Sequence, residues 1–146
     1  MASRRAVRLR AQLRGGRDRW RRWVLLTQGV YYVLTGLWPL VHFDSFARFV
    51  ALNVIPFQAQ AFAAVIIVIG ASLIEAARRE PPGPYPTMLG TAVAGAIAIV
   101  SLFWLPRMGV ASGLWIDFAI EVAFAAALVL LYPRAQPEPS RKTRRR

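Results

Sequence analysis

The chain has 146 residues, of which 56% are hydrophobic and 18% charged, and its net charge is +12. This length allows one domain of ordinary size, and an apolar share so high is typical of membrane proteins. The sequence has no cysteine and one histidine, His42. Disulfides, cysteine-ligated metals and multi-histidine metal sites within one chain are therefore excluded.

The N-terminal segment, residues 1–22, holds nine arginines and a single acid, Asp18. We predict a basic cytoplasmic helix here, broken at Gly15-Gly16, that binds anionic lipid headgroups, since each arginine near an anionic surface contributes about 1 kcal/mol. Arginines also neutralise the phosphates of nucleic acids. Nucleic acid is the less favoured partner, because the sequence has no groove-reading motif and the segment has few aromatic residues for base stacking.

Four long apolar segments follow, at 23–41, 59–77, 87–105 and 110–132. At a rise of about 1.5 Å per residue, each is long enough to cross about 30 Å of hydrocarbon. We therefore predict an all-α fold in which residues 23–132 form an integral membrane four-helix antiparallel bundle with disordered basic tails. The C-terminal tail, 133–146, is polar, rich in proline and basic, a composition typical of disorder.

Prolines and an amphipathic pattern mark the connections between these segments. Pro39 is predicted to kink the end of the first span, and Pro106 to end the third. The proline-rich stretch 81–86 is predicted to be a tight turn. Residues 45–52 are predicted to form a short amphipathic helix at the membrane interface.

The distribution of basic residues predicts the orientation. Both tails and the Arg78-Arg79 loop fall on one side of a four-span topology, whereas the other side has only Arg48 and Arg107. The positive-inside rule therefore places both termini in the cytoplasm and the protein in the inner, or plasma, membrane.

Two stripes of small residues recur at every fourth position, one on the third span and one on the fourth. Such stripes let helices approach closely in lipid. We interpret both as packing faces within the bundle, with a homo-oligomer or protein-partner interface as the alternative. The stripes are Gly90, Ala94 and Ala98 and Ala119, Ala123 and Ala127.

Two acids, Asp117 and Glu121, lie within the fourth span. A spacing of four puts both side chains on one helical face, about one turn apart. An ionised acid near the centre of a bilayer costs roughly 2.5–3.5 kcal/mol on insertion scales. The pair therefore requires hydrogen-bond partners, protons or a ligand.

The predicted topology brings further polar residues towards this pair. His42 and Asp44 end the first span on the outer side, where the fourth span begins, and Arg48 and Arg107 on the same side are possible charge partners. The candidate cluster is thus His42, Asp44, Asp117 and Glu121. Glu75 lies at the opposite, cytoplasmic side and is expected to pair with Arg78 or Arg79, three and four residues on.

Three interpretations of the cluster stay open. The first is a buried polar clasp with a structural role. The second is a cation or proton site, in which His42, Asp117 and Glu121 would suit Mn, Fe or Zn. The third is a pocket for a lipophilic substrate, with a carboxyl group as general acid.

No catalytic motif accompanies the acids. The sequence therefore favours a small structural or accessory membrane protein that needs no cofactor. A transport protein or a membrane enzyme is the alternative.

The stretch Gly36-Leu-Trp-Pro-Leu-Val-His42, followed by Ser45-Phe46, resembles a recurrent segment of small bacterial four-span membrane proteins of uncharacterised function. Those proteins also carry an Asp-x-x-x-Glu pair in the last span, matched here by Asp117 and Glu121. The resemblance implies a four-span fold but no activity or cofactor. Their outer loop is more polar than residues 49–54 here. The layout is also similar to that of four-span sterol isomerase-like proteins, which use acidic residues within the bundle.

Overall fold

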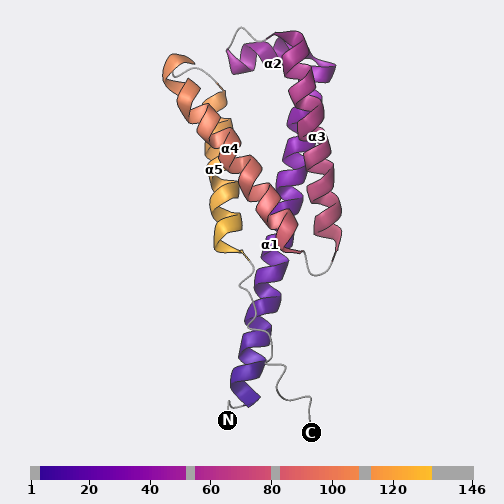
Figure 1. Ribbon diagram of the computed structural model, residues 1–146, viewed down its shortest axis with the longest axis vertical. Coiled ribbons are helices and arrows are strands. Elements are labelled where there is room, and N and C mark those ends of the chain that lie inside the picture. The colour runs from indigo at the N-terminus through magenta and orange to yellow at the C-terminus, as the bar shows by residue number, and fades with distance from the viewer. Residues whose placement is uncertain (1–3, 52–54, 80–82, 109–112, 133–146) are drawn as a thin grey trace, which may run out of the picture.

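The structure, a computed structural model, describes residues 4–51, 55–79, 83–108 and 113–132, with the backbone alone for 4–14. The described chain is helical and has no strand (Figure 1). Its helices are α1 (Arg4–Val41), α2 (Phe43–Val50), α3 (Pro56–Arg78), α4 (Pro84–Met108) and α5 (Leu114–Leu130). The predicted all-α class is confirmed. The predicted C-terminal tail, 133–146, lies outside the described residues.

Three of the helices are long and apolar enough to cross a membrane. The segments concerned are Gly15–Val41, Pro56–Arg78 and Pro84–Arg107. They coincide with the first three predicted spans, each extended by a few residues. In the fourth predicted span the structure describes α5, which has 17 residues.

Helix α1 runs without interruption through Gly15 and Gly16, so the predicted break is wrong. Each glycine costs a helix only about 1 kcal/mol relative to alanine, and the neighbouring arginines and leucines are good helix formers. With 38 residues, α1 is about 57 Å long at 1.5 Å per residue. Its N-terminal part extends well beyond the other helices (Figure 1).

Two predictions based on proline are also wrong. Helix α4 begins at Pro84, inside the stretch predicted to be a turn, because proline is tolerated in the first turn of a helix. Pro106 lies within α4, which continues to Met108. Pro106 is two residues from the end of α4, so the backbone N–H that it lacks removes one hydrogen bond from the last turn of the helix only. Pro39 similarly lies inside α1, close to its end.

The predicted short amphipathic helix is present as α2. His42 caps its start, where the Ser45 backbone N–H donates to His42 Nδ1 at 3.4 Å. Ala51 ends it in the left-handed conformation (φ 56°), and the Ala51 N–H donates to the Ala47 carbonyl at 3.0 Å. The placement of α2 at a membrane interface stays a prediction.

The described helices form two closely packed pairs, α1 with α3 and α4 with α5, and the contacts between the pairs are fewer. Glycines bring α1 and α3 together. A Cβ atom on Gly29 would lie 2.7 Å from the Gly70 carbonyl oxygen, and one on Gly70 would lie 2.6 Å from the Gly29 carbonyl oxygen. At Gly36 the same atom would lie 2.9 Å from the Ala63 carbonyl oxygen. The backbones of α1 and α3 therefore touch.

The two predicted stripes of small residues differ in burial. Gly90, Ala94 and Ala98 on α4 are buried, as expected for a packing face. Ala119 and Ala123 on α5 are exposed, so the prediction that their stripe packs within the chain is wrong. The face that α5 buries is instead the one that carries Glu121 and Leu128.

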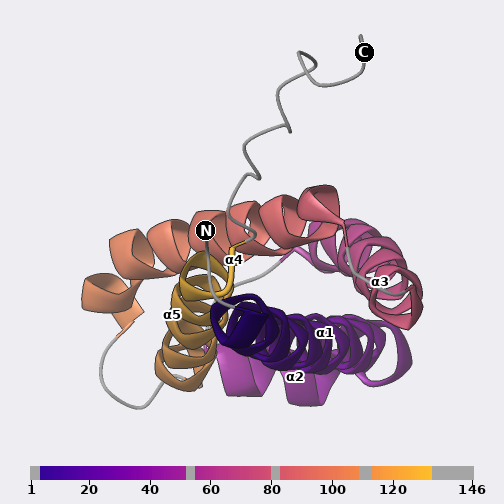
Figure 2. The same cartoon turned by 90° about the horizontal axis from the view of Figure 1, so that it is seen from below.

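The two pairs meet at one end of the molecule and separate towards the end that carries α2 (Figure 1). Figure 2, a view along the long axis of the molecule, shows α1, α3, α4 and α5 arranged in a ring. Where the pairs meet, Leu25, Leu73 and Leu128 are fully buried. Evenly packed four-helix bundles differ from this arrangement of two pairs.

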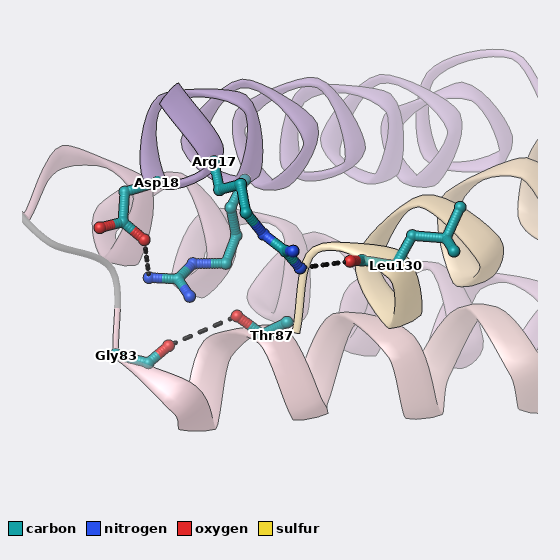
Figure 3. Close-up of polar contacts among 6 residues, drawn as sticks. Arg17, Asp18, Gly83, Thr87 and Leu130 are labelled. Carbon is teal, nitrogen blue, oxygen red and sulfur yellow. Dashed lines mark hydrogen bonds and ion pairs between the residues drawn. The ribbon is translucent and has the colours of Figure 1, made fainter. Parts of the chain in front are cut away.

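One polar contact joins the two pairs at the end where they meet, and two others lie beside it, within α1 and at the start of α4 (Figure 3). Arg17 Nη2 on α1 donates to the Leu130 carbonyl oxygen at the end of α5, at 2.6 Å. Cations stabilise helix C-termini because the last carbonyls there lack helical partners. Asp18 forms an ion pair with Arg21 at 3.0 Å, and Thr87 on α4 donates to the Gly83 carbonyl at 3.4 Å. At the α2 end, the Gly113 backbone N–H at the start of α5 donates to the Phe49 carbonyl of α2 at 2.9 Å.

Candidate functional site

A cavity of about 670 Å³ lies where the helix pairs diverge, and all five helices contribute to its walls. Ligand pockets in proteins commonly measure about 300–1,000 Å³. Most of the lining side chains are apolar. The aromatic ones are Tyr31, Tyr32, Trp38, Phe46, Phe49, Phe62 and Trp104.

The only ionisable acids and bases among the described lining residues, apart from the two tyrosines, are Asp117 and Glu121. Glu121 is 1% exposed, and Asp117 is partly buried. Helix α5 places them together because residues four apart share one helical face. The structure therefore puts the predicted acidic pair on the wall of a cavity.

Each carboxyl group accepts a hydrogen bond from a tyrosine of α1. The Tyr31 hydroxyl donates to Asp117 Oδ1 at 2.6 Å, and the Tyr32 hydroxyl donates to Glu121 Oε2 at 2.8 Å. The Tyr31 ring also packs against Phe124, with centroids 5.8 Å apart. These two bonds attach α5 to α1 beside the cavity.

Gln28 extends this network to a third helix. Its Nε2 donates both to the Tyr32 hydroxyl at 3.0 Å and to the Gly90 carbonyl of α4 at 2.9 Å. Gln28 is fully buried. A continuous chain of hydrogen bonds thus runs from Gly90 through Gln28 and Tyr32 to Glu121, and it fixes the orientation of the Glu121 carboxyl.

Sequence analysis did not single out Gln28, Tyr31 or Tyr32. All three lie within the apolar segment 23–41. A usable signal was present, because Gln28 and Tyr32 are four residues apart and so share a face of α1. Gln28 and Tyr32 in the first predicted span thus have the same spacing as the two acids in the fourth, which indicates that the two polar faces could lie against each other.

The other two members of the predicted cluster and its possible charge partner Arg48 lie elsewhere. His42, Asp44 and Arg48 are exposed, and none of them lines the cavity. His42 accepts at the start of α2, as described above. Trp38, which lines the cavity, donates from its Nε1 to Ser45 Oγ at 2.7 Å. The structure brings Asp117 and Glu121 together but does not add His42, Asp44 or Arg48 to them.

Arg107, the other possible charge partner of the cluster, and Glu75, predicted to lie on the cytoplasmic side, have contacts of their own. Arg107 is exposed, donates to the Phe103 carbonyl at 2.5 Å and lies over the Phe103 ring, 4.2 Å from its centroid. Glu75, far from the cavity, forms exposed ion pairs with Arg78 (4.0 Å) and Arg79 (3.5 Å). The partners of Asp117 and Glu121 are tyrosine hydroxyls.

The described residues offer little to a metal ion. Among them, no three histidine, aspartate or glutamate side chains lie close enough together to hold one. The metal site considered from sequence required His42 beside Asp117 and Glu121, and the structure places His42 at the α2 cap instead. The site is better described as an apolar cavity with two hydrogen-bonded carboxyl groups.

Comparisons of this chain with protein-family models, with curated proteins and with solved structures find no match. The resemblance to small four-span bacterial proteins accordingly stays an expectation. The function has to be argued from the cavity and the groups that line it.

Proposed function

We propose that this chain is an integral membrane protein with four spans, α1, α3, α4 and α5, that binds a lipophilic molecule in the cavity between its helix pairs. Three of these helices meet the length and hydropathy that a span requires. The 17 described residues of α5 cover about 25 Å. Large apolar side chains are exposed along all four helices, which suits contact with lipid.

We further propose that both termini lie in the cytoplasm and that the protein resides in the inner membrane. The basic residues of 1–22, of the Arg78-Arg79 loop and of 133–146 support this orientation. The cavity and α2 then lie in the outer half of the bilayer. The arginines of the extended α1 would bind anionic headgroups at the cytoplasmic surface.

The observation that carries the binding proposal is the cavity itself, apolar along most of its wall and polar at one place. It reaches the surface of the protein between α3 and α4, because Phe62, Val100 and Trp104 line it and are also exposed. In the proposed topology that surface faces lipid. A lipophilic molecule would enter sideways from the bilayer without passing through water.

This proposal favours the lipophilic-ligand interpretation of the acids over the purely structural one. Two tyrosine–carboxyl bonds would fasten α1 to α5 equally well in a filled interior. The cavity of about 670 Å³ beside these bonds lowers stability, because the side chains that line it lose packing contacts. A purely structural role for the acids does not explain this loss. We propose binding and no chemical step.

Filling the cavity tests the proposal. Ala96 lines the cavity and is exposed on α4, so Ala96→Trp would add an indole to the cavity without breaking a buried contact. Ala92 is exposed one turn earlier and does not line the cavity, so Ala92→Trp is the matched control. The full chain in nanodiscs should bind a neutral pyrenyl alkane saturably, as measured by its fluorescence.

Ala96→Trp should weaken this binding about tenfold or more, equivalent to roughly 1.4 kcal/mol, whereas Ala92→Trp should leave it unchanged. Uptake that rises linearly with the pyrenyl alkane, as in empty nanodiscs, would contradict the proposal. So would equal binding by the two variants.

A further inference from the structure

The groups that line the cavity also indicate what kind of lipophilic molecule it accepts. We infer that the bound molecule is a cationic amphiphile, in which an N–H-bearing ammonium group lies against Asp117 and Glu121 and an apolar chain occupies the rest of the cavity. The inference rests on the proposed function, because it needs the cavity to be a binding site. It adds the charge, the hydrogen-bonding character and the orientation of the ligand.

Charge is the first argument. The lining residues that the structure describes include two carboxyl groups and no lysine, arginine or histidine. Opposite charges attract strongly where water is excluded, since the energy scales inversely with the dielectric constant. A ligand with a phosphate or carboxylate would meet repulsion here, whereas an ammonium group would supply the positive charge that the two acids lack.

Hydrogen bonding is the second argument. A carboxylate has two oxygens and about four acceptor positions. Tyr31 and Tyr32 each occupy one oxygen of one carboxyl. The other two oxygens, Asp117 Oδ2 and Glu121 Oε1, receive no hydrogen bond from the residues that the structure describes. An ammonium group has up to three donors and can bond to both free oxygens, whereas an alcohol has one.

The length of the cavity is the third argument. Tyr31 and Trp38 both line it and lie seven residues apart on α1, about 10 Å along the helix axis. Trp38 packs against Phe49 and Phe46, with centroids 5.0 and 6.0 Å apart, and forms an apolar wall at the α2 end. The polar group would thus lie at the acids, and the apolar chain would extend towards α2.

Photolabelling in nanodiscs of zwitterionic lipid tests the inference with three probes of equal chain length. These are photoreactive forms of dodecylamine, dodecanol and dodecanoic acid, with the attachment sites mapped by mass spectrometry. Labelling of cavity residues is divided by labelling of Ile99, an exposed α4 residue that does not line the cavity. This ratio corrects for unequal partitioning of the probes into the bilayer.

The amine should label the cavity about tenfold more than the alcohol, since hydrogen bonds between charged groups are stronger than those of a neutral hydroxyl. The acid should label it least. Glu121→Gln should remove most of the preference for the amine and spare labelling by the alcohol. The new amide oxygen can still accept from Tyr32, so the network that holds the helices is kept. Asp117→Asn is the second variant, for use if the first does not fold.

Glu75→Gln is the matched control, because Glu75 is an exposed carboxyl paired with Arg79 and lies outside the cavity. It should retain the full preference for the amine. Equal cavity labelling by amine and alcohol would overturn the cationic class and leave the proposed function standing. An amine preference that survives in both Glu121→Gln and Asp117→Asn would also overturn it. Absence of cavity labelling by all three probes would overturn the inference and the proposed function together.

Discussion

The tyrosine hydroxyls decide how two acids can be accommodated inside the apolar helix α5. Tyr32 is 1% exposed, donates to Glu121 and accepts from Gln28, so it is the central member of a buried polar chain. A buried polar group left without its partner costs far more than the net value of one hydrogen bond. The acids are therefore held through their partners on α1.

Replacing Tyr32 with phenylalanine should lower the free energy of unfolding by about 1–3 kcal/mol, because Glu121 loses its donor and Gln28 loses an acceptor. Tyr85→Phe is the control, since Tyr85 is 79% exposed and should change stability by no more than about 0.5 kcal/mol. Unfolding of the purified chain by denaturing detergent, followed by circular dichroism, gives both values. Equal effects of the two substitutions would rule out the proposed role of Tyr32.

At this scale the sequence predicts the acids but not their partners. The spacing of Asp117 and Glu121 places them on one face from local geometry alone. Their tyrosine donors are 86 and 89 residues away in the chain, so that pairing depends on how α5 lies against α1. His42 was expected near the acids because it ends the first predicted span on the same side. In the structure its side chain instead caps the start of α2.

At the scale of helices, glycine contacts set the geometry of the α1–α3 pair. Gly29 and Gly36 are seven residues apart on α1, and Ala63 and Gly70 are seven apart on α3. This spacing keeps small residues on the contact face over two turns. Close backbone approach is the usual means by which helices associate in lipid.

Gly70→Ala should destabilise the protein by about 1–3 kcal/mol, the usual cost of overpacking. The added methyl would lie 2.6 Å from the Gly29 carbonyl, which is backbone and cannot move aside. Gly95→Ala is the matched control, because nothing lies within 4 Å of the position of its methyl. It should be neutral or stabilise the helix by up to about 1 kcal/mol. The same detergent unfolding measurement applies, and loss of stability in Gly95→Ala but not in Gly70→Ala would contradict this packing.

Hydrophobic length predicts the helices well and their ends less well. The helices of the first three predicted spans are present, because apolar runs of this length leave few alternatives. The short α2 is present where an amphipathic helix is predicted. The predictions that a helix breaks at Gly15-Gly16 and that another ends at Pro106 were wrong. The free-energy cost of one unfavourable residue is smaller than the gain from continuing the helix. The stripe at Ala119 and Ala123 failed because composition cannot tell which of two small-residue faces is buried.

At the scale of the whole molecule, the helices form two pairs that meet near Leu25 and Leu128 and diverge towards α2 (Figure 1). The Arg17–Leu130 hydrogen bond and the buried leucines stabilise the end where the pairs meet. The other end leaves room for the cavity. This arrangement could not be predicted from the sequence, because four apolar spans are equally compatible with an evenly packed bundle.

The position of a lipophilic molecule relative to the five tryptophans tests the cavity most directly. Trp38 lines the cavity, whereas Trp23, 58% exposed, lies near the middle of α1 and does not. In nanodiscs of deuterated lipid, protonated dodecanol should give nuclear Overhauser effects to the Trp38 indole protons that saturate with its concentration. Effects at Trp23 should be weaker and should not saturate. Equal, unsaturable effects at both tryptophans would show that the molecule only dissolves in the bilayer around the protein.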